Sequence, residues 1–416
     1  MPLDILLAAL GAIALLARVG FALYAAGLVR SKNSAGMVVR MICDLCVSTL
    51  VFWGIGAAIL FQQHNSVFAL RADLIFSNIS SSRPFTEFLF FQLAMNLIAS
   101  GAMAGATAER FRFFPLCGAS LLLSGFLLPV AGNWAWYGWL ASRGFIDIGG
   151  GAALHVTAGV SAAVAAIVVG PRTGKFNRDG SSSMIPGHNL PLAGIGAMLV
   201  LAGWLAYIAG AGLMVSVRLI NPFPQHVVEI SSPAAFNALL SASAAGLAAL
   251  LVGQLRYGKP DVVLALMGFI GGLVAISAGA GLVSTPGAAL IGAVTGIFLP
   301  VLAVALDLRL RIDDPAGAIS IYALAGAWGT LATAFFAPAL AFGRWHQFAV
   351  QAIGVVSIAA FSAVVSFVFF AALKYTVGIR AREADEFDGL DLAEHDIGAY
   401  PDFQQTMIKS YHLREM

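Results

Sequence analysis

The stretch from 147 to 172 reads Asp147-IGGGAALHVTAGVSAAVAAIVVGP-Arg172 and holds no charged residue between its two ends. Coiled as a helix, it is long enough to cross the ~30 Å of hydrocarbon in a bilayer. Stretches of this kind fill most of the chain and are too long and too weakly alternating to be barrel strands. The sequence therefore predicts an all-α integral membrane protein with eleven transmembrane helices, at about 5–29, 38–61, 85–107, 113–132, 149–170, 190–217, 232–254, 261–282, 285–306, 318–341 and 347–373.

The composition supports a membrane protein. Of the 416 residues, 59% are hydrophobic and only 11% are charged, whereas a soluble protein is about 25% charged. Three cysteines, Cys43, Cys46 and Cys117, are too few for a disulfide scaffold, and the Cys43/Cys46 pair lies in an apolar run without a neighbouring His. We therefore expect core cysteines, no metal site and no cofactor. A net charge of +2 without a basic cluster gives no indication of a nucleic-acid partner.

Lysine and arginine are unevenly divided between alternate loops. One set of connections holds 15 of them and the other holds 5, namely Arg71, Arg83, Arg143, Arg218 and Arg344. By the positive-inside rule the richer set faces the cytoplasm, so we expect a multi-pass protein of the plasma (inner) membrane with its N-terminus outside. Residues 1–375 form the predicted transmembrane domain. Residues 376–416 form a charged cytoplasmic tail, whose segment 403–416 has near-helical apolar spacing and could lead to a further domain.

Few ionisable residues lie inside the predicted spans, and these are the candidates for function because a bilayer makes them costly. His155 lies near mid-span among small residues, where it can be either a structural core residue or a functional one. Asp147 can cap the start of the same helix. Arg18 has no acidic neighbour in sequence and either extends to the interface or pairs across helices. Trp136 lies in an aromatic cluster that fits an interfacial belt, or a cation–π site for an arriving cation.

A series of motifs follows in order along nearly the whole chain. The motifs are Gly27 to Asn33, Ala108 to Phe113, Asp147 to Gly159, His188 to Pro191, Gly203-Trp204, Gly271 to Ser277, Asp313 to Pro315, Gly326 to Gly329 and Gly389 to Pro401. Together they resemble the ammonium transporter family (Amt/Mep/Rh). The resemblance implies eleven helices with an inverted 5+5 repeat, and a homotrimer with one pore in each subunit. It also implies an outer vestibule that recruits ammonium, two gating Phe rings and a hydrogen-bonded His pair.

Carried over residue by residue, the resemblance gives a modified pore. His155 matches the first pore His and Asp147 its supporting Asp, whereas Tyr322 stands at the second pore position. The remaining matches are Trp136 for the vestibule Trp, Met95 and Tyr207 for the gating rings, Trp204 beside the pore, Ala211 for a vestibule Ser, and Gly317 for an Asp.

A His–Tyr pair relays protons poorly, because a phenol with a reference pKa of about 10 holds its proton where an imidazole at about 6.5 releases it. We also expect Tyr322 to hydrogen-bond His155. The leading interpretation is a non-enzymatic ammonium sensor that binds ammonium, conducts it poorly or not at all, and signals through its tail to a fused or docking cytoplasmic partner. The alternatives are a conducting ammonium transporter with an altered pore and a Rh-like channel for a small neutral molecule such as carbon dioxide.

Overall fold

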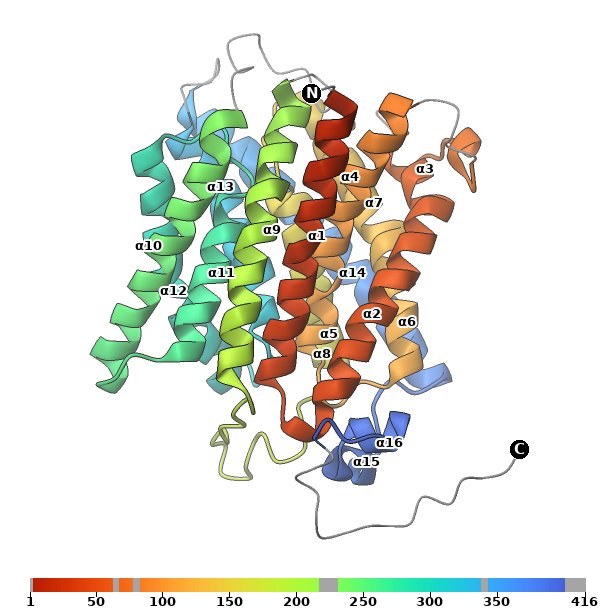
Figure 1. The fold of residues 1–416 in the computed structure, drawn as a ribbon, viewed down its shortest axis with the longest axis vertical. Coiled ribbons are helices and arrows are strands. Elements are labelled where there is room, and N and C mark those ends of the chain that lie inside the picture. The colour runs from red at the N-terminus through yellow and green to blue at the C-terminus, as the bar shows by residue number, and fades with distance from the viewer. Residues whose placement is uncertain (1–2, 63–66, 78–82, 217–230, 338–342, 401–416) are drawn as a thin grey trace.

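The computed structural model describes residues 3–62, 67–77, 83–216, 231–337 and 343–400, and every regular element in these ranges is a helix. The helices stand side by side as an upright bundle, with the N-terminus at one end and two short tail helices at the other (Figure 1). They are α1 Leu3–Leu28, α2 Ser34–Val51, α3 Ala57–Leu60, α4 Arg83–Ser100, α5 Ala102–Ala106, α6 Phe113–Leu122, α7 Leu128–Trp136, α8 Thr157–Val169, α9 Leu190–Ser216, α10 Ser231–Tyr257, α11 Val262–Ile276, α12 Thr285–Leu308, α13 Ala325–Phe336, α14 Arg344–Thr376, α15 Glu383–Asp388 and α16 Leu390–His395.

The predicted membrane-spanning helices are found at the expected places. In the described residues, 10 helical stretches are long and apolar enough to cross a bilayer. The one remaining predicted span, 261–282, is a shorter apolar helix, α11, because the chain leaves the helix after Ile276. Several of the long rods contain a π-helical turn, and such turns join α2 to α3 (Phe52–Gly56) and α6 to α7 (Leu123–Leu127).

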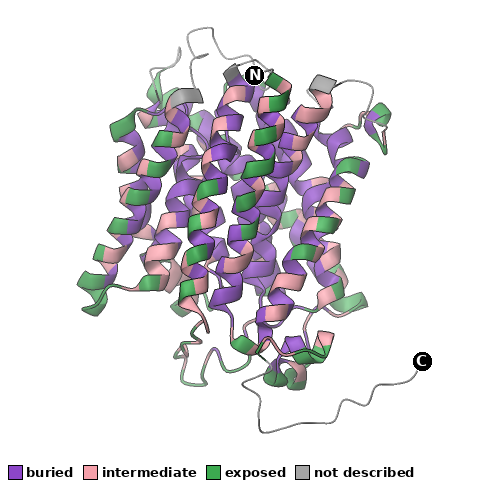
Figure 2. Cartoon of the chain, in the orientation of Figure 1, coloured by how far each residue is buried: buried purple, intermediate pink, exposed green. Residues whose placement is uncertain are grey.

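The outside of the bundle is apolar, as a lipid-facing surface must be. The exposed positions in Figure 2 follow the outer faces of the long helices, while the centre is buried. Large exposed side chains on these faces are hydrocarbon, among them Leu247, Leu251, Ile195, Val364 and Phe367. A soluble bundle would place charge there, so the surface supports membrane insertion independently of the helix lengths.

Close packing at the centre depends on glycine. Helices α1 and α9 run alongside each other (Figure 1). A Cβ placed on Gly20 of α1 would collide with the backbone of α9, and one placed on Gly196 or Gly203 would collide with the backbone of α1. Lipid gives helices no hydrophobic reason to associate, so small residues that allow close backbone contact supply the packing instead.

Candidate functional site

Two π-helical turns meet at the centre of the bundle, and both are built in the same way. Gly151–Val156 carries His155 and Ile319–Leu324 carries Tyr322. Each turn follows an aspartate, Asp147 or Asp314, that stands eight positions before His155 or Tyr322. In each case the glycine three positions after the aspartate has a positive φ, +72° at Gly150 and +64° at Gly317.

The two aspartates cap their turns through backbone amides. An oxygen of Asp147 accepts hydrogen bonds from the N–H groups of Ala152 at 3.1 Å and Ala153 at 2.8 Å. The carboxylate of Asp314 accepts them from Ala318 at 2.9 Å and Ile319 at 2.7 Å. Asp147 is therefore a capping residue, as one interpretation of the sequence had it. Glycine at 317 follows from the left-handed conformation that this turn requires.

The two turns run in opposite directions. Helix α8, which continues from the His155 turn, ends at Val169 beside the tail, where the carbonyl of Val169 accepts a hydrogen bond from Arg380. Helix α13, which continues from the Tyr322 turn, ends at Phe336, next to the start of α14 at the other end of the bundle. The equivalent, antiparallel construction is what an inverted repeat produces.

His155 is fully buried among aromatic rings. Its ring stacks on that of Trp204 with centroids 5.1 Å apart and lies 5.6 Å from that of Tyr322. Its Nε2 is 3.5 Å from the hydroxyl of Tyr207, and its Nδ1 has no hydrogen-bond partner among the described residues. The predicted residues His155, Tyr322, Tyr207 and Trp204 thus come together in one cluster.

The expected hydrogen bond between Tyr322 and His155 is not formed. The phenol hydroxyl of Tyr322 donates instead to the backbone carbonyl of Ile98, at 3.3 Å. Its ring packs edge-on against Phe21, with centroids 5.4 Å apart. Since a phenol has one proton to donate, this bond takes it away from the imidazole, and the two pore residues are in contact only through their rings.

The residues around this pair are held by hydrogen bonds of their own. The Tyr207 hydroxyl donates to the carbonyl of Gly149, and the Trp204 indole N–H donates to the hydroxyl of Ser277 at 3.3 Å. The Trp136 indole N–H donates to the carbonyl of Asp147 at 2.6 Å, which fixes Trp136 against the loop that precedes the His155 turn. Met95 is completely buried in α4, a helix that contacts the same turn.

Arg18 pairs across helices, which was one of the two sequence interpretations. Its guanidinium donates to the carboxylate of Asp44 at 2.6 Å, and both side chains are at most 3% exposed. The hydroxyls of Ser100 and Ser120 donate to the same carboxylate at 2.7 and 2.6 Å. Four helices, α1, α2, α4 and α6, are joined by this one carboxylate.

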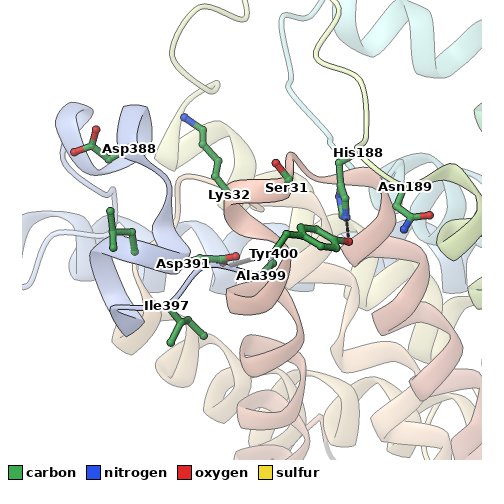
Figure 3. A pocket seen from close by; sticks show the side chains of 11 residues that line it. Ser31, Lys32, His188, Asn189, Asp388, Asp391, Ile397, Ala399 and Tyr400 are labelled. Atoms are coloured by element: carbon green, nitrogen blue, oxygen red, sulfur yellow. Dashed lines mark hydrogen bonds between the residues drawn. The ribbon is translucent and has the colours of Figure 1, made fainter. Parts of the chain in front are cut away.

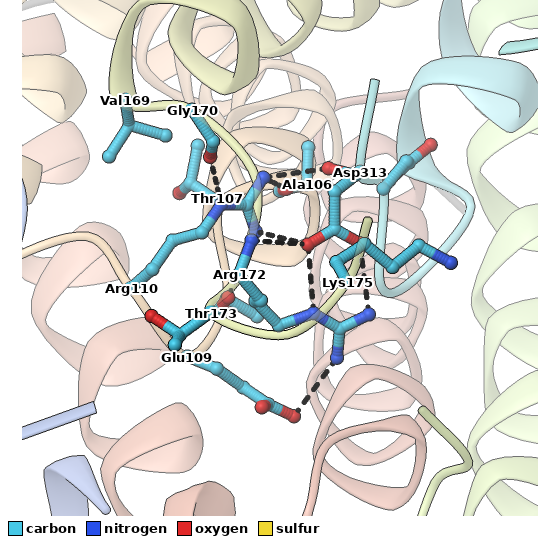
Figure 4. A network of polar contacts seen from close by, with 12 residues as sticks. Ala106, Thr107, Glu109, Arg110, Val169, Gly170, Arg172, Thr173, Lys175 and Asp313 are labelled. Atoms are coloured by element: carbon cyan, nitrogen blue, oxygen red, sulfur yellow. Dashed lines mark hydrogen bonds and ion pairs between the residues drawn. The ribbon is translucent and has the colours of Figure 1, made fainter. Parts of the chain in front are cut away.

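A second charged network closes the tail end of the bundle (Figure 4). Arg172 makes two 2.9 Å bonds to the carboxylate of Asp313 and lies 3.3 Å from Glu109. Glu109 also pairs with Arg30 at 2.6 Å. Arg110 donates to the carbonyl of Asp313 at 2.7 Å. Although burial opposes ionisation, the charges of Arg172 and Arg110 hold the pKa of Asp313 at about 2.

The tail docks on this end through three acidic side chains. Asp391 accepts hydrogen bonds from the backbone N–H groups of Ala35 and Gly36, at the start of α2. Glu394 pairs with Arg40 and accepts from the N–H of Phe113. Glu386 accepts from the N–H of Thr173 at 2.7 Å. The segment 376–400 is therefore anchored, whereas the predicted continuation 403–416 lies outside the described residues.

The docked tail leaves an open pocket beside it, drawn in Figure 3. Tyr400 reaches across this pocket and its hydroxyl lies 2.9 Å from Nε2 of His188. Nδ1 of His188 is in turn 2.9 Å from the carbonyl of Val29, at the end of α1. His188 thus links the tail to the residue that follows the first helix. No group of three metal-ligating side chains gathers anywhere in the part of the chain that the structure describes.

The sequence analysis missed three of these features. One is Asp314, the counterpart of Asp147, and the spacing of eight residues that both aspartates keep to Tyr322 and His155 could have revealed it. Ser277 as the partner of Trp204, and Asp44 as the partner of Arg18, give no such signal because they lie 73 and 26 positions away in sequence.

Comparison with known proteins identifies the chain. The profile of the Ammonium Transporter Family matches residues 5–400. The ammonium transporter Amt2 of Archaeoglobus fulgidus is 31% identical, over 98% of this chain and 90% of its own length. Amt1 of Haloferax mediterranei is 32% identical, over 92% of this chain and 76% of its own length.

Solved structures agree with this comparison. A structure named Sensor Amt Protein superposes with a TM-score of 0.87 at 30% identity, over 94% of this chain and 98% of its own. Mep2 of Candida albicans has a TM-score of 0.81 over 98% of this chain and 92% of its own, and at 23% identity supports the fold alone. The chain belongs to the Ammonium Transporter Family.

Proposed function

We propose that this chain is the membrane module of an ammonium sensor, which binds ammonium from outside, conducts it poorly or not at all, and passes the change to its tail. The observation that carries the proposal is the bond from the Tyr322 hydroxyl to the carbonyl of Ile98. The phenol oxygen can still accept a hydrogen bond, but its one proton points to a backbone carbonyl, so Tyr322 cannot hand a proton onward along the pore. A relay along the pore therefore stops at the His155–Tyr322 pair.

Binding does not need that relay. The cluster around His155 offers ring faces from Trp204 and Tyr322, and the Tyr207 hydroxyl 3.5 Å from its Nε2. Ring faces attract a small cation by roughly 0.5–2 kcal/mol, depending on desolvation. Trp136 and Met95, with Tyr207, are the residues we assign to ammonium recruitment, and Asp147 and Trp204 support the site.

A continuous set of contacts leads from both pore turns to the tail. Arg172 follows α8, the helix that continues the His155 turn, and holds Asp313, which precedes the aspartate that caps the Tyr322 turn. The next residue, Thr173, is bound by Glu386 of the tail through both its N–H and its hydroxyl. A relative movement of the two pore turns would pull on the Arg172–Asp313 bond and so on the neighbouring contact between Thr173 and Glu386, which supports the tail as the segment that carries the signal.

We further propose the arrangement in the membrane that the charge distribution predicts. The chain lies in the plasma membrane with the N-terminus outside and the tail in the cytoplasm. The homotrimer is proposed on the family resemblance. Residues 1–375 form the ammonium-binding domain. Residues 376–416 form the segment that a fused or docking signalling partner reads. The sensor name of one similar structure supports this proposal.

Flux and binding measured on the same reconstituted protein test the proposal. Calorimetry is expected to show heat from ammonium binding, while proteoliposomes show no saturable uptake of methylammonium. Tyr322→His is expected to raise uptake, because it places a second imidazole beside His155. The matched control is Tyr375→His, the same exchange at a residue that is 85% exposed.

The opposite result has an equally definite meaning. Saturable uptake by the unmodified protein, unchanged in Tyr322→His, would show that this position does not limit conduction. The protein would then be a conducting ammonium transporter with a His–Tyr pore. Absence of any heat from ammonium would exclude both functions.

A further inference from the structure

The hydroxyl of Tyr207 lies between two groups of the pore cluster, the carbonyl of Gly149 and the imidazole of His155. A carbonyl can only accept a hydrogen bond, so the phenol donates its single proton to Gly149. The phenol oxygen lies 3.5 Å from Nε2 of His155 and has no second proton to offer to that nitrogen. The hydroxyl can therefore act toward the imidazole only as an acceptor.

The two neutral forms of His155 differ in how well they fit this hydroxyl. With the proton on Nε2, the ring donates to the oxygen of Tyr207, and the one unsatisfied atom of the ring is the bare Nδ1, which has no partner among the described residues. With the proton on Nδ1, two lone pairs face each other across the 3.5 Å, and a buried N–H has no acceptor. Because unpaired buried polar groups are costly, the first form is favoured.

The surroundings also disfavour the charged form of His155. The residue is 0% exposed, and neither ring nitrogen bonds to a carboxylate in the part of the chain that the structure describes. A charge at this depth without a counter-ion is expensive in a bilayer. The neutral ring with its proton on Nε2 is thus the form that fits the geometry.

Nε2 of His155 faces the end of the bundle that is farther from the tail. Helix α9 begins at Leu190, near the docked tail, and runs to Ser216 at the opposite end (Figure 1). Trp204 stacks on the face of the imidazole, and Tyr207 follows nearly one turn farther from the tail. The edge of the ring that meets Tyr207 therefore faces the outer end of the pore in the proposed orientation.

We propose that Tyr207 is a positioning residue that fixes His155 in the neutral form with its proton on Nε2. An ammonium ion arriving from the outer end then meets an N–H group. Transfer of its proton to His155, which would release ammonia and leave an imidazolium, requires a lone pair on Nε2 that this form lacks. Tyr207 thus adds a second obstacle to conduction, separate from Tyr322. This consequence rests on the proposed function, whereas the position of the proton on His155 does not.

Solid-state NMR of the full chain in lipid bilayers tests the position of the proton. Histidine labelled with 15N and 13C reports the protonation of each ring nitrogen. The chain has 7 histidines, and the signals of His155 are those that disappear in His155→Gln. The unmodified protein is expected to show a protonated Nε2 and a bare Nδ1 at neutral pH. A bare Nε2, or an imidazolium, would overturn the proposal.

Tyr207→Phe tests whether the hydroxyl is the cause. The exchange keeps the ring that packs edge-on against Trp204, with centroids 5.3 Å apart, and removes only the hydroxyl. Loss of this one hydrogen bond is expected to lower the ratio of the Nε2–H form to the Nδ1–H form about fivefold. Tyr375→Phe, the same exchange at a residue that is 85% exposed, should leave the ratio unchanged. An unchanged ratio in Tyr207→Phe would overturn the proposal.

Uptake of methylammonium by proteoliposomes tests the consequence for conduction. Tyr207→Phe/Tyr322→His is expected to take up methylammonium faster than Tyr322→His, because Nε2 of His155 can then accept a proton from the outer end. Equal uptake by these two variants would overturn the role of Tyr207 in conduction. Saturable uptake by the unmodified protein would overturn the proposed function and the obstacle at Tyr207 with it, while the NMR signals would still decide which nitrogen of His155 carries the proton.

Discussion

Removing Arg18 should destabilise the protein by several kcal/mol, because its partner Asp44 is buried. Arg18→Met keeps the length and most of the volume of the side chain but leaves the carboxylate of Asp44 without its counter-ion. Both groups are buried, at 2% and 3% exposure, and their atoms are 2.6 Å apart. Water cannot take the place of the missing partner.

The magnitude follows from what remains around the carboxylate. Breaking one side of a buried ion pair costs about 3–5 kcal/mol. Ser100 and Ser120 still donate to Asp44 at 2.7 and 2.6 Å, so we expect a loss near the lower limit, about 3 kcal/mol. For a chain of 416 residues each kcal/mol lowers the unfolding midpoint by roughly 1–2 °C, so the midpoint should fall by about 3–6 °C.

A double-mutant cycle in detergent measures the pair. Apparent unfolding midpoints at one fixed scan rate are compared for the unmodified protein, Arg18→Met, Asp44→Asn and the double variant. The double variant should recover part of the loss of Arg18→Met, because the neutral amide no longer needs a counter-ion. If the two losses simply add, Arg18 and Asp44 are not energetically coupled and the reasoning fails.

Three further predictions concern the thiols, the tail and the stability of the protein at low pH. The sulfur atoms of Cys43 and Cys117 are 3.1 Å apart, so mild oxidation should join these two cysteines in a disulfide. Peptide mass spectrometry that shows Cys43 joined to Cys46 instead would contradict this prediction. Asp391→Ala removes both bonds that this side chain accepts from the start of α2, a cap worth about 1 kcal/mol, so amide exchange in α16 should become roughly fivefold faster. Asp388→Ala, the same change at an exposed position, should leave the exchange unchanged. The lowered pKa of Asp313 adds stability above pH ~4, and this stability is lost as the pH falls through about 2. The unfolding midpoint should therefore fall over this interval, and it should fall less in Asp313→Asn. Equal falls in the two proteins would count against the ion pair.

Hydropathy predicted the long helices because each of them places apolar side chains against lipid over its whole length. It placed the end of the span 261–282 too far along the chain. Ser277 and Ala278 are apolar or small enough to continue the run, but their carbonyls accept the N–H groups of Gly149 and Ile148. The helix therefore ends where its backbone carbonyls bond to the loop before the His155 turn, and hydropathy does not predict the partners of backbone carbonyls.

The pore cluster was predictable to the level of which residues meet. His155, Tyr322, Tyr207 and Trp204 followed from the resemblance, and the structure brings all four together. How they bond was not predictable. The Tyr322 hydroxyl donates to the carbonyl of Ile98. This bond depends on the position of α4, which no local pattern specifies.

The two aspartate-capped turns have a consequence for how such proteins evolve. The backbone of each turn is fixed by Asp147 or Asp314 and by a left-handed glycine, and not by His155 or Tyr322. The eighth position after each aspartate can therefore exchange imidazole for phenol without disturbing the scaffold. On the proposed function, a lineage passes between transporter and receptor through one codon, and relatives with the same architecture should be sorted by that side chain before their overall similarity is considered.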